Sequence, residues 1–320
     1  MKVSNVLGLL LIALPFVYLG IAHIAAAMRE DVAEANFPPE GEIIIVDASA
    51  VHAVVQGEGP DVVLIHGANG NARDFTLSFA GQLAERGYRV ITFDRPGFGY
   101  SDPVYEDPGS LTAQAARLVA AANVLEADQP IVLGHSLGGA VAMAWATQHP
   151  DNISGLIPLS AVTNFWPGPT DALYRYTNSF FGRIFINPGI AAFLPQSYID
   201  RVMDIVFVPQ TIPDGFPEHI GAPLTIRRSS ISVSAAERVE LKDNVLELVP
   251  FYEDITVPVE ILHGDADLTV SWVLHSEKLA TQIDGANLTL LEGIGHMPHH
   301  HTPDAVLDAI DRVAARAGLN

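Results

Sequence analysis

A serine in a glycine-rich turn has the surroundings of a nucleophile. Residues 134–138 read Gly-His-Ser-Leu-Gly, between an apolar run at 130–133 that predicts a strand and a segment at 137–148 that predicts a helix. A sharp strand-to-helix turn favours flanking residues without a Cβ atom, and it projects the serine hydroxyl above the end of the strand. We therefore predict Ser136 as a nucleophile, with the amide of Leu137 at the start of the helix, where developing negative charge is stabilised. The alternative is a serine in an ordinary glycine-rich turn.

A histidine and two aspartates lie where they could activate that serine. A serine hydroxyl is a weak nucleophile and needs a histidine base, which a carboxylate orients. Asp265 and Asp267 follow an apolar run at 257–263, and His296 closes a Gly-Ile-Gly-His sequence after another run at 287–291. Because the carboxyl ends of parallel strands meet at one edge of a sheet, these side chains can converge on Ser136. His296 is the predicted base, and either aspartate can supply the carboxylate.

The elements that would position these residues alternate along the chain. A strand pair is predicted within residues 42–56, and single strands at 62–65, 89–93, 130–133, 153–159, 257–263 and 287–291. Helices are predicted between them, at 75–86, 111–125, 137–148, 271–283 and 303–317. This alternation is typical of a twisted, mostly parallel sheet with helices on both faces. We predict an α/β core made of residues 42–161 and 251–320.

The alternation stops between residues 162 and 250, which predicts a helical insertion into the core. Eleven aromatic residues lie between Asn164 and Phe216. This enrichment indicates a helical lid that lines an apolar pocket. The alternative is that a small helical subdomain uses its aromatic residues for its own packing.

These features together resemble the α/β-hydrolase fold family, from about residue 42 to residue 317. The resemblance implies Ser136 as the nucleophile, His296 as the general base and Asp267 as the orienting acid. In the family the acid stands three positions after a glycine, and Asp267 stands three positions after Gly264. Asp265 remains the alternative acid. If Asp265 is not the acid, we expect it to be a turn residue that caps the following loop. The His-Gly-Ala sequence at 66–68 resembles the family's oxyanion segment, which implies that the amides of Ala68 and Leu137 form an oxyanion hole.

The resemblance implies a serine hydrolase that cleaves a carboxylic ester or a related acyl bond of a small, partly apolar substrate without a cofactor. Similar proteins of this fold cleave carbon–carbon bonds, lactones or amides, or act as cofactor-free perhydrolases, and these reactions stay open as alternatives. Similar dehalogenases and epoxide hydrolases carry an aspartate where this chain has Ser136, so their chemistry is disfavoured. A membrane-tethered binding protein that has lost catalysis is the third alternative.

An apolar run at the N-terminus predicts a membrane segment. Residues 6–28 are almost uninterrupted in apolar character, and as a helix they would span about 34 Å, enough for a hydrocarbon core of about 30 Å. We expect residues 1–28 to form a transmembrane anchor or a cleaved signal segment, residues 29–41 to form a linker, and the catalytic domain to lie outside the cytoplasm.

The composition excludes several other classes of function. The chain has 17 Lys and Arg against 37 Asp and Glu, a formal charge of −20, and such a surface repels nucleic acid. It has no Cys, so a thiolate nucleophile and a Cys-ligated metal are excluded. Three histidines at 299–301 stand beside His296, but they lack the carboxylate spacing of a metal site, and we expect no metal.

Overall fold

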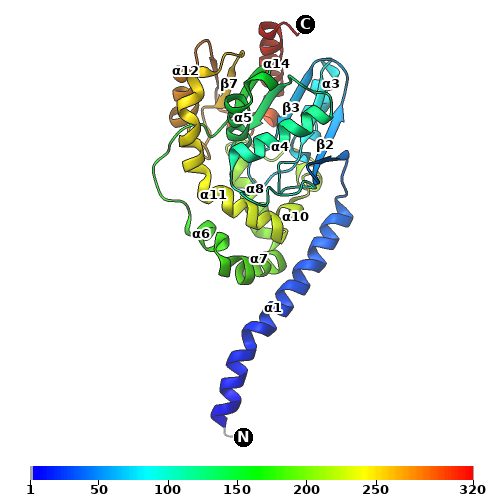
Figure 1. Cartoon of the computed structure of the whole chain (residues 1–320), viewed down its shortest axis with the longest axis vertical. Helices are drawn as coiled ribbons and strands as arrows, with labels where there is room; N and C mark the ends of the chain where they lie inside the picture. The colour runs from blue at the N-terminus through cyan, green and yellow to red at the C-terminus, as the bar shows by residue number, and fades with distance from the viewer. Residues whose placement is uncertain (1–2, 320) are drawn as a thin grey trace.

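An eight-stranded sheet forms the centre of the molecule (Figure 1). The computed structural model describes residues 3–319, with side chains from residue 13 onward. The strand order is β1-β2-β4-β3-β5-β6-β7-β8; β1 and β2 run antiparallel to their neighbours, and all other pairs are parallel. The strands are β1 (Glu42–Val46), β2 (Ser49–Gln56), β3 (Asp61–Ile65), β4 (Arg89–Phe93), β5 (Ile131–His135), β6 (Gly155–Leu159), β7 (Glu260–Gly264) and β8 (Asn287–Leu291).

The central strands are apolar on both faces because helices cover the sheet from both sides. Every residue of β5, β6 and β7 is buried, as expected for parallel strands between two helical layers. One face is covered by α2 (Arg73–Thr76), α3 (Phe79–Glu85) and α14 (Pro303–Ala317), and the other by α4 (Leu111–Val124), α5 (Leu137–Gln148), α11 (Arg228–Leu248) and α12 (Lys278–Gln282). The predicted α/β-hydrolase fold class is confirmed.

The outermost layers follow from local sequence signals. In α14 the buried residues include Val306, Ile310 and Val313, which share one helical face, and the helix ends at Gly318 with a φ of +72°. Helix α4 begins after Ser110, whose hydroxyl accepts a hydrogen bond from the amide of Ala113. Short helical turns complete the core: η1 (Pro150–Asn152), η3 (Val249–Asp254), η4 (Val273–Glu277) and α13 (Pro298–His301).

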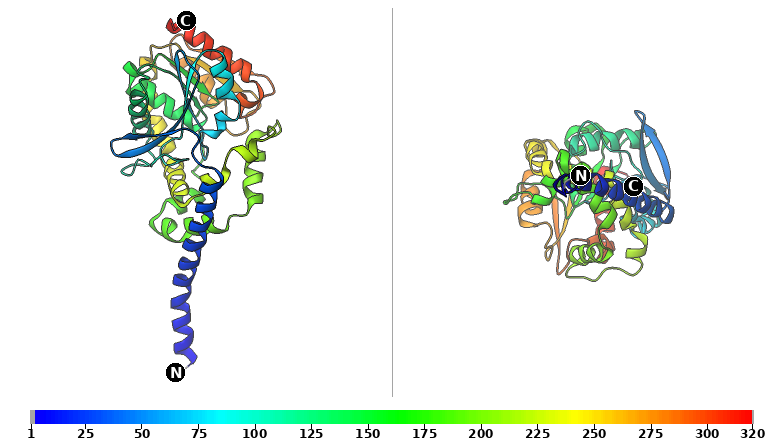
Figure 2. Two further views of the ribbon diagram at one scale, coloured as in Figure 1. Left: turned by 90° about the vertical axis from the view of Figure 1, so that its right-hand side faces the viewer. Right: turned by 90° about the horizontal axis from the view of Figure 1, so that it is seen from below.

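The chain between β6 and β7 leaves the sheet and forms a helical insertion; we refer to residues 162–250 as the lid. It lies on the side of the core from which the N-terminal helix projects (Figures 1 and 2). Besides α11, its helices are α6 (Ala172–Asn178), η2 (Gly182–Ile186), α7 (Asn187–Phe193), α8 (Gln196–Phe207), α9 (Phe216–His219) and α10 (Ala222–Thr225). All of them lie between residues 162 and 250.

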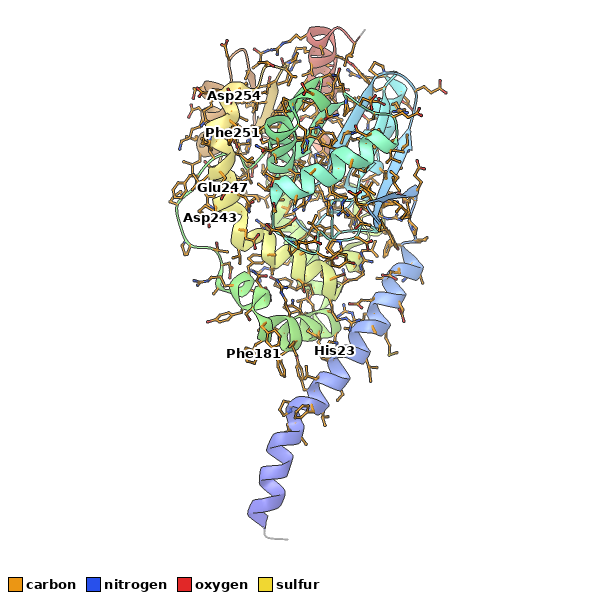
Figure 3. The ribbon with its side chains drawn as sticks, viewed as in Figure 1. His23, Phe181, Asp243, Glu247, Phe251 and Asp254 are labelled. Carbon is orange, nitrogen blue, oxygen red and sulfur yellow. The ribbon has the colours of Figure 1, made fainter. Side chains whose placement is uncertain are left out.

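Helix α1 (Val3–Asn36) extends away from the core at its N-terminal end and packs on the lid with its C-terminal half (Figure 2). Ala22, Ala26 and Ala33 are buried there. Glu30 forms a bidentate ion pair with Arg228, at 2.9 and 2.5 Å, and Arg228 also lies 3.0 Å from His23, which Figure 3 labels. This half of the helix is therefore part of the folded body.

The expected transmembrane anchor is wrong, and so is the localisation built on it. Within residues 13–319, no helix combines the length and apolar character needed to cross a membrane. Residues 6–12 of the expected span lie outside the described side chains. The apolar run gives way to charged residues that pair with the lid, and the helix continues to Asn36, so only residues 37–41 remain as the connection to the sheet.

Candidate active site

Ser136 occupies a strained turn between β5 and α5. Its backbone has a φ of +55° and a ψ of −118°, a conformation that residues with a side chain rarely adopt. The turn is tight: a Cβ atom at Gly134 would lie 2.3 Å from the carbonyl oxygen of Gly138, and one at Gly138 would lie 2.4 Å from that of His66. The two flanking glycines therefore permit a geometry that places the Ser136 hydroxyl at the carboxyl edge of the sheet.

The structure brings Ser136, His296 and Asp267 into one hydrogen-bonded chain. His296 Nε2 lies 2.9 Å from Ser136 Oγ, and His296 Nδ1 lies 2.7 Å from Asp267 Oδ2. Because a carboxylate only accepts, Nδ1 carries the proton of the neutral ring and Nε2 presents its lone pair to the serine hydroxyl. Each of the three residues is at most 8% exposed. A serine hydroxyl is thus held against a base that a buried carboxylate orients.

Asp267 is stabilised as a carboxylate by several donors. Its Oδ1 accepts from the amides of Thr269 and Val270 at 2.7 and 3.0 Å, and His263 Nε2 lies 3.0 Å from Oδ2. Burial raises the pKa of Asp267, but the hydrogen bonds from His263 and His296 outweigh it and hold the pKa well below its usual range. Asp267 therefore stays charged beside His296 over the whole range in which histidine titrates.

Asp265, the alternative acid, has a different place. Its Oδ1 accepts a 2.7 Å hydrogen bond from the amide of Gly293, in the loop between β8 and His296. Its carboxylate makes no hydrogen bond to His296 within the described residues. Asp265 holds two loops together at the edge of the site, while Asp267 contacts the histidine.

A second buried cluster, Asp74 with His135, His299 and His300, lies behind His296. His135 Nε2 donates to the carbonyl oxygen of His296 at 2.8 Å, and its ring centroid lies 4.9 Å from that of His296. Asp74 accepts from His299 and His300 at 3.2 and 3.0 Å. Burial raises the pKa of Asp74, but the neighbouring His299 and these hydrogen bonds bring it well below its usual range.

Three residues of this cluster lie close enough together to ligate a metal ion. One ligand atom each of Asp74, His135 and His299 lie within 4.8 Å of one another. The sequence indicated the histidines but not the carboxylate, because Asp74 is distant from them in the chain. Hydrogen bonds from His299 and His300 already satisfy the carboxylate, and we assign no metal to the cluster.

The loop after β3, residues 66–70, lies directly against the serine. A Cβ atom at Gly67 would be 3.2 Å from the Cβ of Ser136. The next residue, Ala68, borders the same cavity as Ser136. Asn69 has a φ of +54°, and its Oδ1 accepts a 2.6 Å hydrogen bond from Ser234 of α11. The loop is thus fixed between the serine and the lid.

Arg95 holds this loop from behind. Its side chain is fully buried and donates to the carbonyl oxygens of His66 and Gly67 at 3.0 and 3.2 Å. The guanidinium also forms an ion pair with Glu237 of α11 and donates to Gln114 at 2.8 Å. The buried guanidinium of Arg95 therefore contacts both the loop of residues 66–70 and the lid.

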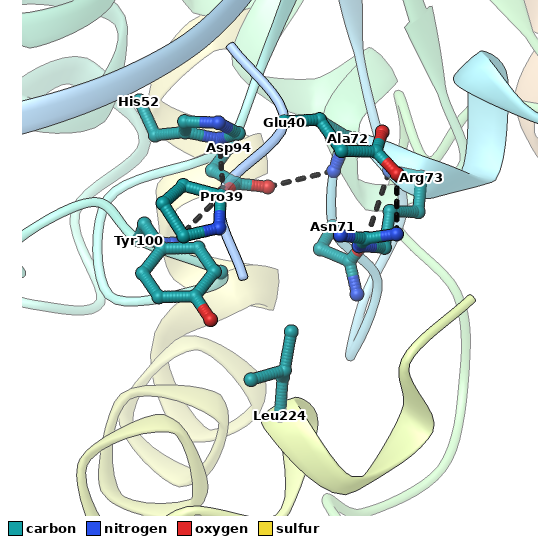
Figure 4. Close-up of a pocket in the computed structure, with 10 residues that line it drawn as sticks. Pro39, Glu40, His52, Asn71, Ala72, Arg73, Asp94, Tyr100 and Leu224 are labelled. Carbon is teal, nitrogen blue, oxygen red and sulfur yellow. Dashed lines mark hydrogen bonds and ion pairs between the residues drawn. The ribbon is translucent and has the colours of Figure 1, made fainter. Parts of the chain in front are cut away.

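A second buried carboxylate fixes the start of the segment that follows the loop. Asp94 Oδ1 accepts from the amide of Ala72 at 2.7 Å, and its Oδ2 accepts from His52 Nδ1 at 2.7 Å and from the amide of Tyr100 at 2.8 Å (Figure 4). Burial raises the pKa of Asp94, but the hydrogen bond from His52 outweighs it. Asp94 thus joins β2, the end of β4 and the residues that lead into α2.

A cavity of about 370 Å³ opens between the core and the lid, with Ser136 and His296 in its wall. Some of the lid aromatics line this cavity and others face outward. Tyr174, Tyr198, Phe207 and Phe216 line the cavity, whereas Phe180 and Phe181 are more than 70% exposed. Most of the remaining wall is aliphatic, including Leu173, Ile190, Leu194, Ile199, Val202, Met203, Val206, Ile220 and Ile226. An apolar group therefore fits beside the serine.

Several residues of the site carry no local sequence signal. His263, Arg95 and Glu237 are buried polar residues whose partners are distant in the chain or unremarkable by type. His263 stands next to the predicted acid segment, which is a weak pointer. The Arg95–Glu237 pair spans 142 positions, and nothing in either neighbourhood indicates the other residue.

Comparison with known proteins assigns the family. Residues 62–309 match the model of the "Alpha/beta hydrolase family". The chain is 27% identical over 266 residues to Lipase 3 of Moraxella sp. (strain TA144), covering 82% of this chain and 78% of the lipase. It is 38% identical over 125 residues to the pimeloyl-[acyl-carrier protein] methyl ester esterase of Shewanella sp. (strain MR-7), covering 37% of this chain and 44% of the esterase. Its fold is similar to the solved esterase EaEST of Exiguobacterium antarcticum, with a TM-score of 0.70 and 22% identity over 86% of this chain and 99% of that one. The family model spans most of the chain, and the protein therefore belongs to the alpha/beta hydrolase family.

Proposed function

We propose that this protein is a serine hydrolase that cleaves carboxylic esters through an acyl-enzyme. One observation carries the proposal: a buried histidine, oriented by Asp267, presents the lone pair of Nε2 to Ser136 Oγ at 2.9 Å. This is the arrangement that activates a serine hydroxyl. The lipase and esterase relatives support an ester as the substrate.

In the proposed first step, Ser136 Oγ attacks the ester carbonyl carbon while its proton moves to His296 Nε2. The carbonyl oxygen becomes an oxyanion, which the amides of Ala68 and Leu137 would stabilise; the Leu137 amide opens helix α5. The tetrahedral intermediate then expels the alcohol, which takes the proton from His296, and the acyl group stays on Ser136. The charge of Asp267 stabilises the imidazolium in both transfers.

In the proposed second step, His296 removes a proton from water as the water oxygen attacks the acyl carbon. Collapse of the second intermediate releases the carboxylic acid and returns the proton to Ser136 Oγ. No cofactor enters either step. The apolar wall of the cavity would hold the acyl or alcohol part, and we propose residues 162–250 as the lid that selects it.

The test is hydrolysis of p-nitrophenyl esters from acetate to palmitate by the full chain and by Ser136→Ala. The matched control is Ser154→Ala, since Ser154 precedes β6 and its buried hydroxyl has no hydrogen-bond partner among the described residues. We expect kcat to fall by at least about 10³-fold in Ser136→Ala and to stay unchanged in the control. A fluorophosphonate probe should label the wild type and Ser154→Ala but not Ser136→Ala. Equal hydrolysis by all three proteins would refute the proposal.

A further inference from the structure

Helix α11 places two polar side chains in the wall of the cavity, one helical turn apart. Ser234 and Arg238 both line it, together with Ser136. Ser234 donates to Asn69 in the loop beside Ser136, so this turn of the helix lies close to the proposed reaction centre. Residues four apart share a helix face and are separated by about 6 Å. Arg238 therefore lies one turn along α11 from Ser234, in the wall of the same cavity.

The guanidinium of Arg238 has no anionic partner in the described part of the chain. It makes no ion pair and no hydrogen bond there, and its Nε atom is buried without an acceptor. Its recorded neighbour is the ring of Tyr174, whose centroid lies 5.6 Å from Cζ. Arg227 and Arg228, at the start of the same helix, pair with carboxylates of α1.

Among the arginines that make no ion pair in the described part of the chain, Arg238 is the one that lines the cavity of Ser136. The chain has 37 acidic residues against 17 basic ones, so carboxylates are plentiful. The acidic residue in the cavity wall, Asp74, already accepts hydrogen bonds from His299 and His300. A buried donor without an acceptor costs free energy, and a guanidinium fork matches the oxygens of a carboxylate or phosphate. Arg238 is half-buried in the cavity wall, where the oxygens of a ligand can reach the guanidinium.

We propose that Arg238 binds an anionic oxygen group, a carboxylate or a phosphate, on the substrate of Ser136. The inference rests on the proposed ester hydrolysis and extends it to a substrate class: esters with an apolar body and an anionic group several bonds from the scissile carbonyl. The apolar wall receives the body, and the guanidinium holds the charged end. A charge of −20 repels anions at long range, so a local cation is what allows an anionic substrate to be selected.

The kinetic test compares three length-matched p-nitrophenyl esters whose acyl chains end in a methyl group, a carboxylate or a phosphate. The full-length proteins are the wild type, Arg238→Gln, Arg238→Lys and the control Arg201→Gln, an exposed arginine of α8 that does not line the cavity. We expect Arg238→Gln to lower kcat/KM for at least one anionic ester by about 10- to 100-fold, the range of a charge-assisted hydrogen bond. The methyl-ended ester should change by less than about threefold. Arg238→Lys should be intermediate, and Arg201→Gln should match the wild type.

The two anionic arms identify the group, since the ester that loses more in Arg238→Gln carries the preferred oxyanion. An equal loss for all three esters would mean a structural role and overturn the inference, and so would no loss for any of them. Calorimetric titration with hexanoate, hexyl phosphate and hexanol gives an answer even if no ester is cleaved. Binding of either anion, but not of hexanol, should weaken at least tenfold in Arg238→Gln. If neither anion binds the wild type more tightly than hexanol does, the inference fails, whatever becomes of the proposed hydrolysis.

Discussion

Replacing Glu237 with glutamine should destabilise the protein out of proportion to the change of one atom. Glu237 is 1% exposed, and its carboxylate is the counter-charge of Arg95, which is fully buried. The other donors of Arg95 face neutral acceptors: the carbonyl oxygens of His66 and Gly67 and the side chain of Gln114. Glutamine keeps the shape of glutamate but leaves a buried cation without an anion.

The expected magnitude follows from that burial. Breaking a buried ion pair by removing one partner costs about 3–5 kcal/mol. The glutamine oxygen can still accept one hydrogen bond from the guanidinium, so we expect the lower end, about 3 kcal/mol. With an unfolding entropy of about 2.1 cal/mol/K per residue, the 320 residues convert this into a fall in Tm of about 4–5 °C.

Calorimetry and urea unfolding of Glu237→Gln test this reasoning. Glu240→Gln is the matched control, because it makes the same change three residues later on α11, where Glu240 is half-buried without an ion pair among residues 13–319. Burial and the nearby Asp107 raise the pKa of Glu240, so neutralising it should leave stability unchanged or slightly higher. The double variant Arg95→Met with Glu237→Met should lose less than Glu237→Gln. A decrease in Tm of less than about 1 °C in Glu237→Gln would refute the view that Arg95 and Glu237 are energetically coupled.

Two further predictions concern pH and the orienting carboxylate. Burial, with the charge of Arg95, lowers the pKa of His66 to about 4 from an ordinary 6.5, and burial likewise lowers that of His299 to about 4. Between pH 4 and pH 6.5 these two histidines therefore bind protons in the unfolded chain but not in the folded protein. The free energy of unfolding should therefore be highest above about pH 6.5 and should decrease as the pH falls toward 4, by up to about 3 kcal/mol per histidine. Urea midpoints that stay constant from pH 7 to pH 4.5 would contradict this prediction. Asp267→Asn should lower kcat by about 10⁴-fold, because an amide cannot stabilise the imidazolium of His296. The control Asp265→Asn alters only a loop contact and should retain activity within about tenfold of the wild type. Similar losses in both variants would argue against Asp267 as the orienting acid.

Local sequence determined most of the core, and it allowed three residues of the candidate site to be proposed. The bounds predicted for β4, β8, α5 and α14 agree with the structure, because apolar periodicity and end signals act within a few residues. Ser136, Asp267 and His296 could be proposed together because each follows a parallel strand, and such strands end at one edge of the sheet. The choice of Asp267 over Asp265 needed the family resemblance, since both stand in the same loop.

The N-terminal segment shows where local sequence misleads. Hydropathy counts apolar residues along the chain, but it does not register that Ala22 and Ala26 are buried against protein or that Glu30 pairs with Arg228. The Glu30–Arg228 contact joins residues 198 positions apart. Only the folded chain distinguishes an apolar helix that packs on its own lid from one that faces lipid.

Tertiary structure alone decided the remaining features of the site. It brought Glu237 of the lid to Arg95 of the core, and it separated the aromatics of the cavity from the exposed Phe180 and Phe181. It also placed Arg238 in the cavity wall without an anionic partner among residues 13–319, whereas Arg227 and Arg228 pair with α1. Burial and pairing depend on which distant segments meet. A residue's type and its sequence neighbours describe what a side chain can do, and the packing of the lid on the sheet determines which of those options it uses.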